Sequence, residues 1–172
     1  MKSKKQSNKF SQLSLEKKES NLLLELAANN DNDTKIIIYN RLGILFCKTD
    51  IDKSICYFDE AAKLGSTEDE FNCGYFLNQK SLLLKSKNPE EGHDLRKHAK
   101  DYYKRAAEKD HKKAIINYYN MCVEDDDNDD EVRYFIRRNA DNGNINSMVF
   151  IAKLFEKNPK TTNLSLAYYK MA

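Results

Sequence analysis

The stretch Tyr102-Tyr103-Lys104-Arg105-Ala106-Ala107 decides the fold, because copies of it recur along the chain. Each copy begins with two aromatic or apolar residues and ends with small ones, and the copies begin at residues 57, 102, 135 and 168. Their spacings are therefore 45, 33 and 33 residues. A period in the thirties is typical of helical-repeat solenoids, in which stacked helix pairs bury a continuous core. The repeat predicts the kind of fold and does not identify a partner.

The composition favours an all-α chain. The 172 residues are 40% hydrophobic, enough for one domain with a sizeable core, and they include only five glycines and two prolines. An all-β chain would need more of these turn residues. The formal net charge is +2, so no overall field attracts or repels nucleic acid.

The copies divide the chain into segments. Residues 1–19 carry Lys, Ser, Asn and Gln with little to bury, and we expect them to form a disordered basic and polar tail. A right-handed α-solenoid of stacked antiparallel helix pairs is expected over 20–172. Its parts are, in order, a partial leading helix at 20–34 and repeats at about 35–65, 66–110, 111–143 and 144–172, the last one truncated.

Capping residues mark the ends of the expected helices. Asp33 can cap the first helix of repeat one, and Asp50 or Asp52 can cap its second helix. Repeat two holds about 12 extra residues, which we expect between its two helices. The other start and stop signals are the capping-box variant Ser66-Thr67-Glu68-Asp69, the helix start Asn88-Pro89-Glu90-Glu91, and the glycines Gly65 and Gly143.

Small residues recur in the first helix of the repeats. Aligned on the alanine pairs, this position holds Gly43, Gly74, Tyr119 and Ala152. Glycine or alanine there lets two helix backbones approach, and the aromatic side chains fill the space beside them. In the leading segment, Leu23-Leu24 and Ala27-Ala28 match the aromatic pair and the alanine pair.

These residues together resemble the Sel1-like repeats, which are relatives of the tetratricopeptide repeats. Repeats of that family pair a Leu-Gly in the first helix with an aromatic pair and an Ala-Ala-x-x-Gly in the second. Repeat one has Leu42-Gly43, Tyr57-Phe58 and Ala61-Ala62-Lys63-Leu64-Gly65. Repeat two has Cys73-Gly74, Tyr102-Tyr103 and Ala106-Ala107, with Asp110 in the place of the last glycine.

The resemblance covers about Ser20 to Ala172 and has two departures. The family's Gly-x-Gly turn between the helices is missing, and repeat three has Tyr118-Tyr119 in place of Leu-Gly. The angle between paired helices and the curvature of the superhelix therefore do not follow from the family pattern.

The resemblance implies a concave surface, lined by the first helices, that binds a peptide or a partner domain. The outward positions of those helices, given by the register, are Arg41, Lys48, Asn72, Gln79, Asn117, Asn120 and Lys153. Their side chains can hold a peptide backbone and an acidic residue, or they can simply be solvated. We therefore expect a non-catalytic scaffold or adaptor with a protein partner and without a cofactor.

Two alternatives stay open. Ala172 stops within the last expected helix, so the chain can be a fragment or regulatory part of a larger protein, such as a kinase or ubiquitin-ligase assembly. The basic residues from Arg96 to Lys113, mixed with Tyr102 and Tyr103, could bind RNA. The register assigns both tyrosines to packing, which disfavours nucleic-acid binding.

The acidic run at 124–131 and the three histidines do not form an expected metal site. As a calcium loop the run begins with Asp125, Asp127 and Asp129 but has Asp130 where glycine is required and Ile136 where glutamate is required. The acidic run is therefore expected to be either a solvated loop or a docking site for a basic partner. No His or Cys pair has metal-ligand spacing, and no motif indicates an enzyme.

The chain is expected to be cytoplasmic. Residues 1–10 lack the ~7–15 apolar residues of a secretory signal, and no stretch approaches the ~18 of a membrane span. Cys47, Cys56, Cys73 and Cys122 are therefore expected as buried free thiols. The family resemblance offers an alternative for Cys47 and Cys56, because some secreted Sel1-like proteins close each helix pair with a disulfide.

Overall fold

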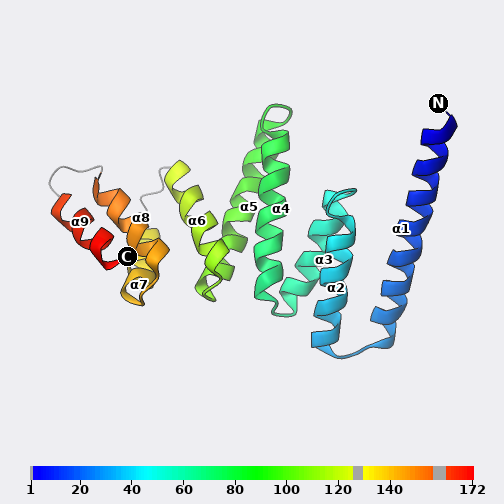
Figure 1. The fold of residues 1–172 in the computed structure, drawn as a ribbon, viewed down its shortest axis with the longest axis horizontal. Helices are drawn as coiled ribbons and strands as arrows, with labels where there is room; N and C mark the ends of the chain where they lie inside the picture. The colour runs from blue at the N-terminus through cyan, green and yellow to red at the C-terminus, as the bar shows by residue number, and fades with distance from the viewer. Residues whose placement is uncertain (1, 126–129, 157–161) are drawn as a thin grey trace. The chain divides into compact units, whose positions relative to one another are not determined.

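The computed structural model describes residues 2–125, 130–156 and 162–172, and the regular elements within them are α-helices (Figure 1). The all-α prediction is confirmed, whereas the handedness and the repeat family stay predictions. The helices are α1 (Lys2–Ala28), α2 (Asn32–Phe46), α3 (Ile51–Lys63), α4 (Thr67–Leu84), α5 (Pro89–Glu108), α6 (Lys112–Glu124), α7 (Asp130–Asp141), α8 (Ile145–Glu156) and α9 (Thr162–Met171).

The chain forms two compact units, and neighbouring helices pack in each. In the first unit, Met1–Lys109, α1 packs on α2, α2 on α3, α3 on α4 and α4 on α5. Short turns join α2 to α3 and α4 to α5, so each of these pairs is an antiparallel hairpin (Figure 1). In the second unit, Asp110–Ala172, α8 contacts α6, α7 and α9.

Side-chain caps begin the helices of the first unit, mostly where the sequence indicates. Asp50 caps α3, Ser66 caps α4 and Asn88 caps α5, each accepting a hydrogen bond from the backbone three residues on. The expectation for α2 was wrong by two residues. Asp31 caps it instead of Asp33, because the Asp31 carboxylate accepts hydrogen bonds from both the backbone and the hydroxyl of Thr34, each at 2.8 Å.

The residue three after each second alanine has a left-handed backbone. Gly65 has φ +104° and Gly143 has φ +83°, and in both turns the following residue donates back to a carbonyl five residues earlier. Asp110 holds the same place after α5 with φ 63°, although it is not glycine. The structure thus confirms that Asp110 replaces the glycine of the other two repeats, a substitution that Asp tolerates better than most residues.

The extra residues of repeat two lengthen both of its helices. α4 and α5 have 18 and 20 residues, compared with 15 and 13 in α2 and α3, and the α4–α5 hairpin is visibly the taller one (Figure 1). The Ser81 hydroxyl donates a hydrogen bond to the carbonyl of Gly92 at 2.7 Å in this added part. The insertion therefore extends the hairpin as regular helix.

In each hairpin of the first unit, an aromatic ring of the second helix packs directly against a glycine of the first helix. A Cβ atom built on Gly43 would lie 2.6 Å from the ring of Phe58, and one on Gly74 would lie 2.8 Å from the ring of Tyr103. Both rings are almost fully buried, and so are the alanine pairs one turn further on. The close approach predicted from the register is confirmed for these two hairpins.

Helix α1 differs from the expectation in two ways. Residues 2–19 continue the helix that ends at Ala28 instead of forming a disordered tail, and no proline or glycine interrupts that stretch. The buried contacts of α1 come from Leu22 and the partly buried Leu26, which pack near Ile38 and Leu42 of α2. Ala27-Ala28 is exposed, because α1 presents the Leu22–Leu26 side to α2. The division into repeats stays a prediction.

We expect Gly43→Ala to lower the stability of the first unit. An alanine in a helix interior is normally favourable by ~1 kcal/mol, but here its methyl group would overlap the Phe58 ring, and overpacking costs about 1–3 kcal/mol. Urea unfolding followed by far-UV circular dichroism measures the change. Ile44→Ala is the matched control, since the adjacent Ile44 side chain is 58% exposed. Equal or higher stability of Gly43→Ala would contradict the contact.

Candidate interaction surface on α2 and α4

Large apolar side chains are exposed on the first helices of both hairpins of the first unit. Ile37 and Ile44 of α2 are 59% and 58% exposed, and Tyr75 and Leu82 of α4 are 42% and 52% exposed. Each pair is seven residues apart, which is about two helical turns, so its members share one side of their helix. Single exposed apolar residues are ordinary, but such a pair on one side of each of two helices needs an explanation.

One apolar position, held by Ile44 and Tyr75, is equivalent in the two helices, whereas the position of Ile37 in α2 holds Glu68 in α4. Gly43 and Gly74 pack against the aromatic ring of their own hairpin, so each glycine marks the inner side of its first helix. Ile44 and Tyr75 directly follow these glycines and therefore match each other in the two hairpins. We name the α2–α4 face by the following residues of α2, the turn that follows it and α4: Ile37, Arg41, Ile44, Lys48, Asn72, Tyr75, Gln79 and Leu82.

A buried carboxylate holds α2 and α4 together beside this face. Asp69 of α4 is 1% exposed, and its carboxylate accepts a hydrogen bond from the Asn40 amide of α2 at 2.6 Å. The Asn72 amide donates to the same oxygen at 3.2 Å, and the Ser66 hydroxyl donates to the other oxygen. A buried carboxylate is stable only with such donors, so Asp69 fixes the spacing of the two helices.

The polar positions expected in the first unit lie in α2 (Arg41), in the turn after it (Lys48) and in α4 (Asn72 and Gln79). Arg41 and Lys48 are exposed, and the Arg41 guanidinium lies 3.5 Å from the Glu25 carboxylate of α1. Asn72 and Gln79 are half-buried, and the Asn72 amide faces Asp69. The sequence prediction placed these four residues on one surface, and whether that surface binds a partner stays a prediction.

The expected positions of the second unit are only partly described. Asn117 is half-buried and Asn120 is exposed, both on α6. Lys153 lies in α8, and its side chain is outside the described residues. Of the acidic run, Glu124 and Asp125 are exposed, whereas the calcium-loop positions 127 and 129 fall outside the described residues.

Ion pairs brace the helices behind the face. Glu70 of α4 is 5% exposed, and its carboxylate contacts Arg105 at 3.3 Å and Lys109 at 2.8 Å. The Lys80 ammonium lies 2.6 Å from the carboxylate of Asp52 on α3. Glu70 is thus a paired buried charge, and removing either cation would leave part of that charge without compensation.

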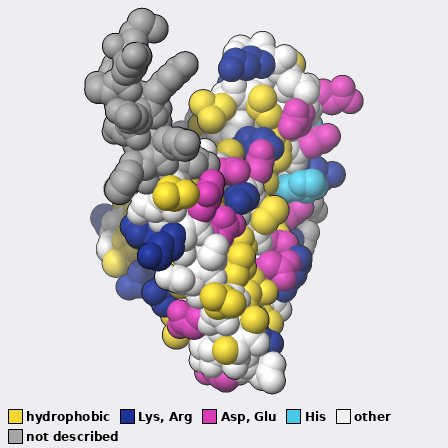
Figure 2. Space-filling view, turned by 90° about the vertical axis from the view of Figure 1, so that its right-hand side faces the viewer, with side chains coloured by type: hydrophobic (Ala, Val, Ile, Leu, Met, Phe, Trp, Pro, Cys, Tyr) yellow, Lys and Arg dark blue, Asp and Glu magenta, His cyan; other side chains and the backbone are white. Residues whose placement is uncertain are grey.

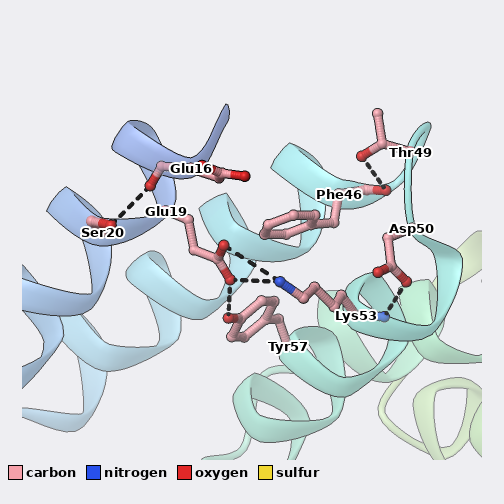
Figure 3. A network of polar contacts seen from close by, with 8 residues as sticks. All are labelled: Glu16, Glu19, Ser20, Phe46, Thr49, Asp50, Lys53 and Tyr57. Atoms are coloured by element: carbon pink, nitrogen blue, oxygen red, sulfur yellow. Dashed lines mark hydrogen bonds and ion pairs between the residues drawn. The ribbon is translucent and has the colours of Figure 1, made fainter. Parts of the chain in front are cut away.

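In the first unit, a tyrosine hydroxyl links α3 to α1 and another links α5 to α3. Figure 3 shows the Glu19 carboxylate of α1 between the Lys53 ammonium and the Tyr57 hydroxyl of α3, at 3.1 and 3.0 Å. The Lys53 ammonium also lies 4.6 Å from the centre of the Phe46 ring. Burial, followed by the hydrogen bond to Glu19, raises the pKa of Tyr57 to about 12.

The same link recurs one repeat later. The Tyr102 hydroxyl of α5 donates a short hydrogen bond to the Asp59 carboxylate of α3. Burial pushes the pKa of Asp59 upward, but the hydrogen bonds from Lys63 and Tyr102 outweigh it and leave the pKa below its ordinary value. In these two pairs the first aromatic therefore contacts the preceding α1 or α3, whereas the second packs inside its own hairpin.

The four cysteines are free, and the expectation that all are buried was wrong for two of them. Cys73 and Cys122 are buried, Cys47 is half-buried and Cys56 is exposed. Burial raises the pKa of the Cys73 thiol, which keeps it protonated and unreactive. Only Cys73 and Cys122 fall on tightly packed helix sides.

No three His, Cys, Asp or Glu among the described residues come together as metal ligands. Within the same part of the chain, no helix combines the length and apolar character needed to cross a bilayer. Apolar residues also lie on α1, where Leu13 and Leu24 are 64% and 70% exposed. Figure 2, seen from the side where α1 lies in Figure 1, shows hydrophobic side chains among charged ones.

Sequence reasoning missed the apolar members of the α2–α4 face. Only polar residues were sought at the outward positions, yet Ile37 and Ile44 flank Arg41 at steps of four and three along α2. Tyr75 and Leu82 flank Gln79 in the same way on α4. The helical period shows that these residues share one side of their helix. Whether that side is buried or exposed depends on how the neighbouring helices pack, which the period does not show.

No family model, curated protein or solved structure matches the chain in comparisons with known proteins. The resemblance to Sel1-like repeats therefore stays a prediction from the residues of the repeats.

The Tyr57 hydroxyl is expected to titrate late. Its folded pKa lies above the ordinary value of about 10, so the stability that it contributes is present below that pH and is lost as pH rises toward 12. Phenolate absorbance of the wild type minus that of Tyr57→Phe isolates this residue. Glu19→Gln should lower the midpoint only in part, since burial remains. A midpoint of 10 in the wild type would contradict the Glu19 contact.

Proposed function

We propose that the chain is a non-catalytic interaction scaffold of Sel1-like, tetratricopeptide-related repeats. It binds a peptide or a partner domain through the outward side of its first helices. The α2–α4 face carries this proposal, because apolar side chains there alternate with basic and amide side chains.

The composition of the face suits recognition of a protein. Ile44 and Tyr75 supply apolar area at matching positions of the two helices, and aromatic residues are enriched where interfaces gain most of their binding energy. Arg41 and Lys48 add charge at its border, which favours rapid encounter with an acidic partner. The Asp69 network holds the helices in place before binding, so less ordering accompanies the association.

The scaffold is proposed to act in the cytoplasm. Free thiols at Cys47, Cys56, Cys73 and Cys122 support this location, because cytosolic proteins keep their cysteines reduced. No catalytic residue or cofactor is part of the proposal.

Charge reversal tests the surface. The triple variant Arg41→Glu, Lys48→Glu and Lys153→Glu, and separately Ile44→Asp, should each remove bound proteins from a co-purification with the full chain as bait. The first reverses the charge of the three basic positions expected from the register, of which Arg41 and Lys48 border the face, and the second places a charge at the apolar centre of the face. Bound proteins are identified by mass and quantified against the wild type. We expect at least a tenfold loss of the stoichiometric partner.

Matched controls separate this effect from changes in net charge. Lys17→Glu, Lys97→Glu and Lys112→Glu together reverse three exposed lysines outside the face. Leu24→Asp places a charge at an apolar residue that is 70% exposed on α1. Both controls should keep the partner. If the face variants retain every partner that the controls retain, the face is not the binding surface.

A further inference from the structure

We infer that the partner segment on the α2–α4 face is an amphipathic α-helix with one acidic edge. This inference rests on the proposed function and specifies the shape and charge of its ligand. Its two supports are the spacing of the exposed apolar side chains and the uneven charge of the two helices that carry them.

The spacing along each helix fits a helical ligand. Ile37 and Ile44 are seven residues apart on α2, and Tyr75 and Leu82 are seven apart on α4, which is about 10.5 Å along a helix axis. A ligand helix repeats its own apolar side at the same seven-residue interval. An extended segment covers about 10.5 Å in roughly three residues, and side chains three apart point to opposite sides of an extended chain.

Backbone hydrogen bonding also favours a helical ligand over an extended one. An extended peptide exposes unpaired N–H and C=O groups and needs side-chain amides on the surface that receives it. The Asn72 amide is already engaged with Asp69, and the Asp69 carboxylate also accepts from Asn40 and Ser66. A helix pairs its own backbone groups and needs only apolar contact at the centre of the face.

The charge of the face is concentrated on α2. Arg41 is exposed on α2 and Lys48 is exposed in the turn directly after it, whereas the matching positions of α4 are the neutral Asn72 and Gln79. Glu25 is the acidic contact of Arg41, at 3.5 Å with both side chains about half exposed, so the guanidinium keeps open area for a second carboxylate. Acidic residues of the ligand should therefore line the edge that faces α2 and the turn after it.

A displayed library of random 16-residue peptides, selected on the full chain, tests the inference. We expect the recovered peptides to repeat apolar residues at intervals of three, four and seven, with Asp or Glu along one edge. Synthetic copies should become helical on binding by circular dichroism. Ile44→Asp and Lys48→Glu should each weaken their binding at least tenfold, measured by fluorescence anisotropy.

Leu24→Asp and Lys97→Glu are the matched controls and should leave the affinity within twofold. Proline-containing, extended or basic peptides that still depend on Ile44 would overturn the helical ligand and leave the scaffold function standing. Peptides that bind equally well to the face variants would overturn both proposals. Failure to recover any peptide that depends on Ile44 or Lys48 would contradict both as well.

Discussion

The contact between an aromatic ring and a glycine determines the arrangement of the first unit. Phe58 on Gly43 and Tyr103 on Gly74 let the two helices of a hairpin approach more closely than any Cβ atom allows. Interiors pack at nearly crystalline density, so this contact also fixes the rotation of each first helix about its axis. That rotation turns Ile44 and Tyr75, which follow the glycines, toward solvent.

Carboxylates then set how successive hairpins stack. Glu19 and Asp59 each accept a tyrosine hydroxyl from the next second helix, and Asp69 accepts an amide from the preceding first helix. Apolar burial supplies most of the stabilisation but is not directional, whereas hydrogen bonds require defined positions. The α2–α4 face therefore depends on polar contacts that the repeat pattern leaves unspecified.

The sequence predicted the features that local chemistry controls. Three of four N-caps and the left-handed turns at Gly65, Asp110 and Gly143 follow from residues a few positions apart. The packing of α1 could not be predicted from its own residues, because the side that a helix buries depends on the helix beside it. The exposed Ile44 was also missed, since an apolar residue beside a core glycine can face either way until the second helix is placed.

The proton chemical shifts of Gly43 and Gly74 test the central claim most directly. A proton held over the face of an aromatic ring moves upfield through the ring current, so the Hα resonances of both glycines should lie well upfield of those of Gly65 and Gly143. Nothing lies within 4 Å of a Cβ built on either of the latter two. Nuclear Overhauser contacts should join Gly43 to the Phe58 ring and Gly74 to the Tyr103 ring. Ordinary Hα shifts without these contacts would contradict the account.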